Sequence, residues 1–592
     1  MTLHPLDRRD WALAALLALL TCGLLMSTSA DVGIPRDESF YLYAGDRAAD
    51  WWLGLFDPST PSFTRKAVEA GFGYNHEHPV LMKSLFGLSH RILHDQLGWI
   101  SSPLLSYRLP SMVMWGLTIA LTYLIGRALQ SRAAGVVGAL ALLCLPRAYF
   151  HAHFACFDVP VTFTWVLTAF CALRALRSRR WAVASGVALG LGFATKLNTF
   201  FLPFALFFVF AYDAWRYRRE TGAWRAAGEA RGPLTYMAWT AGSMLLLGAV
   251  VFFAHWPWLW WDTVARLREY IAFHARHVHY PVDYLGTLWY DPPFPMHFPF
   301  VMTLTTVPVA TLLLGGIGLW VLVGRTVARH KGGVDALRST GPVEVWFWVN
   351  LAVPILVIAA PHTPIFGGIK HWLPSMPFFA VAAGLGAERA LHGLLGRTVA
   401  PAWTVLAGAV LLLPAGVATA RYAPMGEAYY NELVGGPAGA AELRLPRNFW
   451  GYITQGGLDA LNARAEPNAL AFWHDATRGS FDAYKAEGAL RKDIKYTGDW
   501  TAAHSDWGLY HDQRDKHWEE LDLWRAYGTD WPVDGVFVDG VQLLGLYHRP
   551  SAPTMPASLT PPWPPGRATD GGAAEAVSAP PAAEQGQGEQ RE

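Results

Sequence analysis

Long apolar runs follow one another through residues 1–421 and are separated by short polar segments. A helix needs about 20 predominantly apolar residues to cross a bilayer. The pattern therefore predicts about eleven transmembrane helices. They are expected at 11–28, 110–129, 133–150, 159–176, 181–196, 198–214, 234–256, 299–324, 343–360, 372–390 and 399–418.

Two of these spans have alternative interpretations. The first run could be a signal peptide, but it is long, has no clear cleavage site, and many further spans follow it. We therefore expect an uncleaved first helix. The stretch 181–214 could be one long helix, but Lys196 and Asn198 interrupt it, and a charge inside a span is costly unless it lies at an interface or in a cavity.

The remaining segments divide the chain into three predicted regions. Residues 1–421 form a membrane module with long outer loops at 29–109 and 257–298. Residues 422–550 should form a soluble α/β domain, with strands at 469–472 and 536–538, helices near 480–490 and 515–527, and a hairpin at 535–548. Residues 551–592 are rich in Pro, Ala, Gly, Gln and Glu, which predicts a disordered tail. The expected fold class is an α-helical polytopic membrane protein with a C-terminal extracytoplasmic α/β domain.

Charge is distributed unevenly between the two predicted sides of the membrane. Arg and Lys gather in alternate short loops, which places the N-terminus in the cytoplasm and, with an odd number of spans, the C-terminal domain outside. Residues 422–550 carry 12 Lys and Arg against 19 Asp and Glu. The Ala- and Arg-rich composition is typical of a GC-rich bacterium, so we expect the inner membrane and a periplasmic C-terminal domain.

Composition excludes several other classes of protein. Hydrophobic residues make up 52% of the chain and charged residues 16%, whereas a soluble chain carries about 25% charge. A net charge of +1 argues against a globally basic nucleic-acid-binding protein. The four Cys residues include no Cys-x-x-Cys pair, so a disulfide scaffold or a Cys-rich zinc module is not expected.

Carboxylates stand beside the predicted spans at two places on the outer side. Asp37 and Glu38 follow the first span, and Asp158 lies at the edge of the fourth. The simpler interpretations are solvation at the interface for the first pair and a helix cap for Asp158. The functional interpretation of Asp37 and Glu38 is a general base or a metal ligand at the membrane surface, where a base could act on a substrate whose other half is lipid. The functional interpretation of Asp158 is a second active-site carboxylate.

Cations and histidines lie on the same side. Lys83 and Arg108 could anchor their helices at the interface, or they could bind a lipid phosphate. Glu77 and His78 belong to the segment His76-Glu77-His78, which could bind a divalent metal, although adjacent side chains rarely converge on one ion. Lys370 and His371 follow Gly367 and Gly368, where the backbone can approach a ligand closely.

Charge that converges at one membrane surface favours chemistry on a lipid phosphate. A channel more often carries charge within its spans, and a transporter favours midplane breaks and internal repeats. The main alternative is a flippase or transporter of lipid-linked sugars that breaks no bond. A third interpretation makes 422–550 the functional part and the spans its anchor, but about eleven spans are more than an anchor needs.

These motifs resemble the polyprenyl-phosphate-sugar-dependent glycosyltransferases of the GT-C fold. The likeness is greatest to the protein O-mannosyltransferase and aminoarabinose lipid A transferase group, which is glycosyltransferase family 39-like, and it covers about residues 1–420. The sequence has His78-Pro79-Val80 where that family often has His-Pro-Pro. The motifs that carry the resemblance are Asp37-Glu38, His78-Pro79-x-Leu81-x-Lys83, Arg108-Leu109-Pro110-Ser111, Phe157-Asp158-Val159-Pro160, Gly190-x-Gly192-x-Ala194-Thr195-Lys196 and Lys370-His371-Trp372-Leu373-Pro374.

The resemblance implies a donor sugar on a polyprenyl phosphate and an acceptor protein, lipid or glycan on the outer side. Asp37 would be the general base of an inverting transfer, with Glu38 beside it, and Asp158 would orient the acceptor or a cation. Lys83, Arg108, Lys196 and Lys370 would bind the lipid phosphate. Glu77, His78 and His371 would complete the substrate site. A divalent metal is compatible with this mechanism but is not required by it.

Overall fold

The computed structural model describes residues 3–224, 232–276, 279–330, 341–396, 399–497 and 502–549. Residues Met1–His548 form one compact unit. The predicted disordered tail at 551–592 lies outside the described residues.

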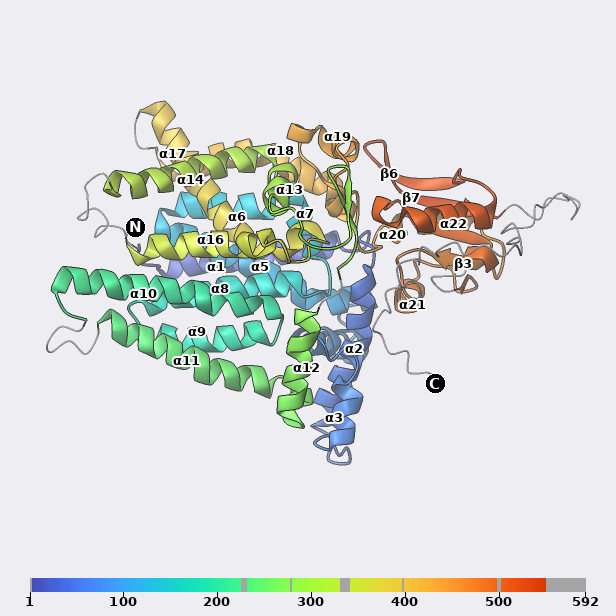
Figure 1. The fold of residues 1–592 in the computed structure, drawn as a ribbon, viewed down its shortest axis with the longest axis horizontal. Helices are drawn as coiled ribbons and strands as arrows, with labels where there is room; N and C mark the ends of the chain where they lie inside the picture. Colours follow the sequence, from blue (N-terminus) through green and yellow to red (C-terminus); the bar gives the residue numbers. More distant parts are fainter. Residues whose placement is uncertain are drawn as a thin grey trace, which may run out of the picture. The chain divides into compact units, whose positions relative to one another are not determined.

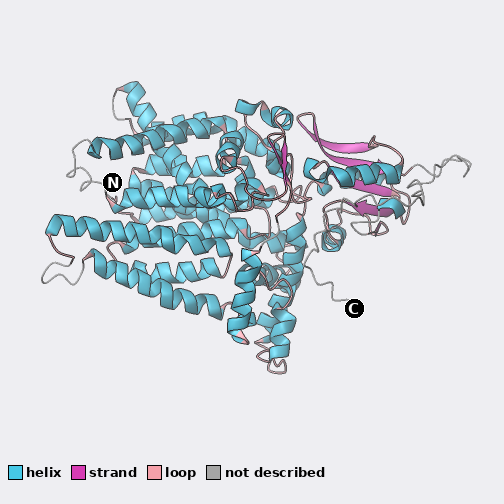
Figure 2. Ribbon diagram, in the orientation of Figure 1, coloured by secondary structure: helices cyan, strands magenta, loops and turns pink. Residues whose placement is uncertain are grey.

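Helices occupy every position at which the sequence predicts a span (Figures 1 and 2). They are α1 (Arg8–Ser27), α5 (Pro103–Leu129), α6 (Arg132–Leu143), α7 (Pro146–His151), α8 (Asp158–Ala175), α9 (Arg179–Phe193), α10 (Phe201–Thr221), α11 (Pro233–Ala254), α13 (Phe298–Thr306), α14 (Val309–His330), α16 (Pro342–Ala359), α17 (Met376–Leu395) and α18 (Pro401–Tyr422). This confirms an α-helical integral membrane protein.

The number of helices that could cross a membrane is smaller than the sequence predicts. Within the described residues, 7 helices are long and apolar enough, or 8 if α13 and α14, which are bent by 120°, form one span. Helix α6 has 12 residues and α9 has 15, which gives lengths of about 18 and 22 Å against a hydrocarbon core of about 30 Å.

The structure breaks the predicted span at 133–150 and confirms the interruption that Lys196 and Asn198 predict within 181–214. The run at 133–150 divides into α6 and α7 because Pro146 cannot continue a helix but suits the first turn of a new one. The run at 181–214 divides where α9 ends, and the 3₁₀ turn η2 (Leu197–Phe200) leads into α10. Each break places a cation, Arg147 or Lys196, at a helix end.

The long outer loops fold into short helices. Figure 1 shows α2, α3 and α12 running across the direction of α8, α9, α10 and α11. A two-stranded antiparallel hairpin, absent from the sequence prediction, pairs Val282 with Trp289. The outer elements are α2 (Arg36–Gly54), α3 (Arg65–Phe72), α4 (Leu81–Ser89), the π-helix η1 (His90–Gln96), η3 (Pro257–Trp260), α12 (Thr263–Ala275), β1 (Val282–Tyr284), β2 (Thr287–Trp289), η4 (Gly368–His371) and η5 (Leu373–Ser375).

The C-terminal region is an α/β domain built on a five-stranded sheet of order β4-β3-β5-β7-β6. Strand β3 is parallel to β4 and β5, and β7 is antiparallel to β5 and β6. The predicted helices and the terminal hairpin are present. The elements are η6 (Ala423–Ala428), η7 (Glu432–Val434), α19 (Gly436–Glu442), α20 (Thr454–Arg464), β3 (Leu470–Trp473), α21 (Arg478–Ala486), β4 (Lys495–Tyr496), η8 (Ala502–His504), β5 (Trp507–His511), η9 (Arg514–Lys516), α22 (His517–Tyr527), β6 (Asp534–Val538) and β7 (Val541–His548).

This domain is packed against the membrane module. The rings of Phe150 and Tyr452 lie 4.5 Å apart between centroids and belong to one apolar cluster. The backbone N–H of Ile34 donates to the hydroxyl of Tyr484 at 2.7 Å. Glu487 accepts hydrogen bonds at the N-terminus of α5. The residues on both sides of the predicted boundary at 421–422 therefore pack together within one compact unit.

Candidate functional site

Four of the predicted site residues come together from separate segments. Asp37 lies in the first turn of α2, and Asp158 is the first residue of α8. Lys196 stands between α9 and η2, and Lys370 lies in η4. The Nζ atom of Lys196 donates to Asp158 Oδ1 at 2.6 Å. Lys370, 4% exposed, is close enough to Asp37 and Asp158 for their charges to influence it.

Asp37 is held by a residue of the C-terminal domain. The indole Nε1–H of Trp450 donates to Asp37 Oδ2 at 2.8 Å. Burial raises the pKa of Asp37, while Lys370 and the Trp450 hydrogen bond oppose that rise. A carboxylate with a raised pKa and one fixed oxygen is suited to accept a proton, because its basicity is closer to neutral pH.

Lys370 lies over an aromatic surface. Its Nζ is 3.4 Å from the ring centroid of Trp450 and 4.4 Å from that of Phe449. Burial lowers the pKa of Lys370 to about 8, although Asp158 and Asp37 favour its charged form. Trp450 therefore contacts both the candidate base and the candidate cation, through its edge and its face respectively.

Two glycines shape the turn that carries Lys370. Gly367 and Gly368 have φ angles of +75° and +58°, a conformation that other residues rarely adopt. A Cβ atom on Gly367 would lie 2.2 Å from Lys370 Cε. The neighbouring His371 donates from Nε2 to the carbonyl of Phe366 at 2.6 Å, and burial lowers its pKa to about 3. His371 thus fastens this turn as a neutral ring.

Lys83 points into the loop that precedes it. Its Nζ donates to the carbonyl of His78 at 2.9 Å and to both oxygens of Asn75. Burial lowers the pKa of Lys83 to about 7, and Glu77 opposes that shift. The lysine therefore holds the His76-Glu77-His78 turn. The imidazole of His78 packs against Tyr41, with ring centroids 5.9 Å apart.

The His76-Glu77-His78 side chains have separate partners. His76 Nε2 lies 2.9 Å from Glu269 Oε1, and Glu77 Oε1 accepts from Asn75 Nδ2 at 2.7 Å. Within the described residues these three side chains do not converge as metal ligands; the group that does is His90, His94 and Asp95 on η1.

Arg108 and Glu38 form a buried ion pair, and both side chains are 0% exposed. Arg108 donates to Glu38 Oε1 at 2.9 Å and to Oε2 at 2.7 Å, in the two-pronged geometry that suits Arg and carboxylate. Its other contacts are the carbonyls of Val32 and Gly33, and Glu38 also accepts from the N–H of Ala155. The pair joins α5 to the start of α2, directly beside Asp37.

The site also contains residues that sequence reasoning did not select. Arg147 Nη1 donates to Glu427 Oε1 at 2.6 Å, and His151 Nε2 lies 3.1 Å from Glu427 Oε2. All three are buried. Gly368 lies against this group, since a Cβ there would be 3.3 Å from Arg147 Nη1. Glu427 and Trp450 follow the last membrane helix, in a region that the sequence predicts to be a separate domain.

Beyond Asp37, a second set of charges leads into the C-terminal domain. Lys516 Nζ donates to Asp475 Oδ1 at 3.0 Å, and Arg36 lies 3.6 Å from the same oxygen. Tyr280, from the second outer loop, is close enough to Asp37, Arg36 and Asp475 to be influenced by their charges. Polar groups of alternating sign beside a carboxylate can bind the hydroxyl groups of a ligand.

Solved structures that are similar to this chain include three glycosyltransferases. ArnT from Cupriavidus metallidurans in the apo state is 14% identical, with 90% of this chain and 97% of that chain covered and a TM-score of 0.43. The Archaeoglobus fulgidus oligosaccharyltransferase with Zn and sulfate is 12% identical, with coverage of 88% and 70% and a TM-score of 0.45. The arabinofuranosyltransferase AftD from Mycobacteria is 13% identical, with coverage of 92% and 40% and a TM-score of 0.38.

A comparison with curated protein sequences finds no match. Residues 77–228 match the family model described as dolichyl-phosphate-mannose-protein mannosyltransferase. The matched segment contains Glu77, His78, Lys83, Arg108, Asp158 and Lys196. This segment is therefore similar to the protein mannosyltransferase family, which confirms the glycosyltransferase resemblance that the sequence predicts.

Proposed function

We propose that this protein is a membrane glycosyltransferase that moves a sugar from a polyprenyl-phosphate donor to an acceptor at the outer, periplasmic face of a bacterial inner membrane. The observation that carries the proposal is the meeting of Asp37, Asp158, Lys196 and Lys370 at one site. The family match over 77–228 supports the donor class. Solved relatives are described as bound to undecaprenyl phosphate and to a dolichol-phosphate with an inhibitory peptide.

In the proposed reaction Asp37 is the general base. It takes the proton of an acceptor hydroxyl while the acceptor oxygen attacks the anomeric carbon of the donor sugar. The bond from that carbon to the phosphate oxygen breaks on the opposite face, so the configuration inverts. Trp450 holds one carboxylate oxygen and thereby aims the other at the acceptor.

The leaving phosphate gains charge as its bond to the sugar breaks. Lys370 and Lys196 are the cations beside Asp37 and Asp158 that would stabilise this charge in a setting of low dielectric. Asp158 positions Lys196 by accepting its hydrogen bond. In the free protein the same contact gives the buried carboxylate of Asp158 a charged partner.

The other predicted residues act on the shape of the site. Arg108 and Glu38 are assigned a positioning role, since they are fully buried and bonded to each other. Lys83 holds the turn that presents Glu77 and His78 beside Tyr41, and it reaches a phosphate only if the turn rearranges. His371 holds the Lys370 turn.

The activity test uses the full-length protein in detergent with a labelled polyprenyl-phosphate sugar and candidate acceptors. Release of free polyprenyl phosphate together with a glycosylated product of inverted configuration is the expected result. Movement of the intact donor across vesicles without bond cleavage would instead make the protein a flippase, and retention of configuration would exclude direct attack by the acceptor.

The alkaline limb of the pH profile of kcat/KM should depend on the protonation of Lys370. Because phosphate stabilisation needs the protonated amine, kcat/KM for the donor should fall as the pH rises through about 8, the pKa to which burial lowers Lys370. The Lys370→Arg variant keeps its charge at all these pH values, so its alkaline limb should move to higher pH. An alkaline limb at the same pH in both proteins would assign the titration to another group.

The acid limb of the pH profile should depend on the pKa of Asp37 and on its hydrogen bond from Trp450. In Trp450→Phe the ring under Lys370 remains, but the hydrogen bond that lowers the pKa of Asp37 is lost. The pKa of Asp37 should rise, and the acid limb of the pH profile of kcat should move up by about one to two pH units. A hydrogen bond to a charged group contributes about 1.5–3 kcal/mol, and one pH unit equals about 1.4 kcal/mol. Phe449→Leu is the matched control, because Phe449 contacts Lys370 without bonding to Asp37. An acid limb that moves equally in both variants would contradict the assignment.

A further inference from the structure

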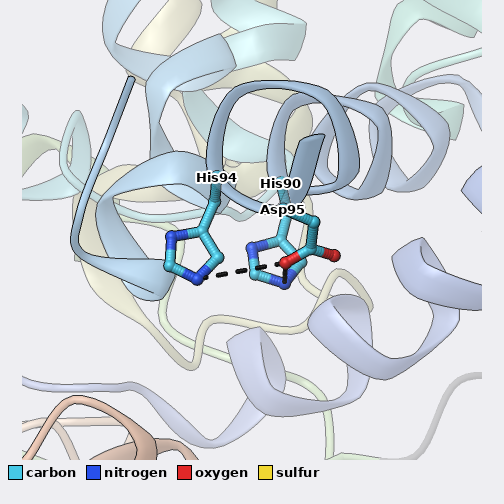
Figure 3. Close-up of side chains that lie close together, drawn as sticks. All are labelled: His90, His94 and Asp95. Atoms are coloured by element: carbon cyan, nitrogen blue, oxygen red, sulfur yellow. Dashed lines mark ion pairs between the residues drawn. The ribbon is translucent and has the colours of Figure 1, made fainter. Parts of the chain in front are cut away.

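The π-helix η1 presents three potential metal ligands on one face (Figure 3). His90, His94 and Asp95 each offer a ligand atom, and these atoms lie within 4.8 Å of one another. The i to i+5 hydrogen bonding of a π-helix brings residues four and five apart onto nearly the same face, and such turns often occur at functional sites. The two imidazole rings are stacked, with centroids 5.0 Å apart and planes at 14°.

Hydrogen bonds on the far side of each ring fix which nitrogen is free. His94 Nδ1 lies 2.8 Å from the carbonyl of Ile100, which can only accept, so Nδ1 carries the proton. The hydroxyl of Ser106 gives its one proton to the carbonyl of Pro103, so it accepts from His90 Nδ1 at 2.9 Å. Nε2 is therefore the nitrogen with a free lone pair in both neutral rings, and both Nε2 atoms lie within 4 Å of Asp95 Oδ1.

The distances suit a shared cation better than direct hydrogen bonds. Asp95 Oδ1 is 3.6 Å from His90 Nε2 and 3.9 Å from His94 Nε2, whereas a hydrogen bond to nitrogen is about 2.7–3.2 Å. Ligands of a tetrahedral zinc ion with bonds of about 2.0–2.1 Å lie about 3.3 Å apart. Rotation of the two stacked imidazole rings, which closes ligand separations of up to 4.8 Å, would seat an ion between the three atoms.

The surroundings orient the candidate ligands. Arg91 Nη1 donates to Asp95 Oδ2 at 3.0 Å and leaves Oδ1 facing the imidazoles, while the rest of its guanidinium binds Asp50. Tyr107 stacks on His90 with centroids 4.0 Å apart. Bonds from the outer side of a ligating histidine are the usual way in which proteins orient it.

We propose that His90, His94 and Asp95 bind one divalent transition-metal ion, with zinc as the best match. Two imidazoles and one carboxylate favour Zn²⁺ and similar ions over Mg²⁺ or Ca²⁺, which prefer oxygen ligands. The side chain of Asp95 is 37% exposed, so solvent can provide the fourth ligand. Through the hydrogen bond between His90 and Ser106, the ion would link η1 to α5. It would thereby stabilise the segment between α4, which carries Lys83, and α5, which carries Arg108.

The test measures metal binding directly and does not depend on the proposed transferase activity. Full-length protein in detergent is stripped with a chelator and titrated with Co²⁺, whose visible absorption reports tetrahedral nitrogen and oxygen ligands. Metal content is then measured after Zn²⁺ loading. The wild type should bind one equivalent more than His94→Ala or Asp95→Asn, while His504→Ala, an exposed histidine of the C-terminal domain, should match the wild type.

A variant with an intermediate effect distinguishes the residues that bind the metal from the residues that orient them. Ser106→Ala removes the acceptor that orients His90, and it should weaken Co²⁺ binding by about 10- to 100-fold without abolishing it. Added Zn²⁺ should raise the thermal midpoint of the wild type but not that of Asp95→Asn. In chelator this variant should lose only the small contribution of the partly exposed Arg91 ion pair. Equal metal content in the wild type, His94→Ala and Asp95→Asn would overturn the proposal.

Discussion

Asp37→Asn should reduce sugar transfer by about 10²- to 10⁴-fold, the usual contribution of a general base. The amide is nearly the same size and can still accept the Trp450 hydrogen bond at 2.8 Å, but it cannot take a proton from the acceptor. Binding of the lipid-phosphate donor should change little, because the lysines that would hold the phosphate remain. Single-turnover transfer with labelled donor, together with a separate donor-binding measurement, checks both parts.

The matched control for this substitution is Asp31→Asn. Asp31 is exposed and lies six residues before Asp37, so its neutralisation alters the local charge without touching the site. Its transfer rate should stay within about twofold of the wild type, since surface changes of this kind usually have small effects. If Asp37→Asn retained the wild-type rate, the proton would have to go elsewhere, and Asp158 would become the next candidate.

Arg108→Ala should destabilise the fold by about 3–5 kcal/mol, because it leaves Glu38 charged and unpaired at a position that is 0% exposed. Glu38→Ala should have an effect of the same order on Arg108. The double replacement Arg108→Met with Glu38→Leu should lose less stability than either single change, since no buried charge is left without a partner. Equilibrium unfolding in detergent, followed by tryptophan fluorescence, measures these differences.

An exposed ion pair provides the control for this second prediction. Arg478→Ala breaks a contact with Asp482 in which both side chains are more than half exposed, and it should change stability by no more than about 1 kcal/mol. The competing assignment of Arg108, as a direct ligand of lipid phosphate, predicts a different result. It would give normal stability and a raised KM for the donor.

Much of the fold could be predicted from the sequence because apolar helices in a membrane have a strong and simple pattern. The breaks were harder to locate. Lys196 signalled the end of α9, but Pro146 lay inside a run that was expected to be continuous. Strand β5 was missed because all of its residues, Trp507–His511, are buried, so it shows no alternation of polar and apolar positions.

The candidate site could be predicted only in part. Charges beside apolar spans stand out in a sequence, and Asp37, Asp158, Lys196 and Lys370 do meet. The other contacts of the site could not be predicted because their residues lie far apart in the sequence. Trp450 lies 413 positions from the carboxylate that it binds. An aromatic residue in a soluble region gives no sequence signal that it contacts a carboxylate in the membrane module. Arg108 looked like a free cation because its neutralising partner, Glu38, is 70 positions away.

The contact of Trp450 with both Asp37 and Lys370 limits how the chain can be recombined. A C-terminal domain exchanged between similar proteins would bring a foreign residue to the carboxylate oxygen of Asp37 and to the position beneath Lys370. Such a hybrid could fold and insert normally and still be inactive. We therefore expect differences in acceptor choice between similar proteins to arise in the loops around this contact. Trp450, Asp37 and Lys370 should change only together.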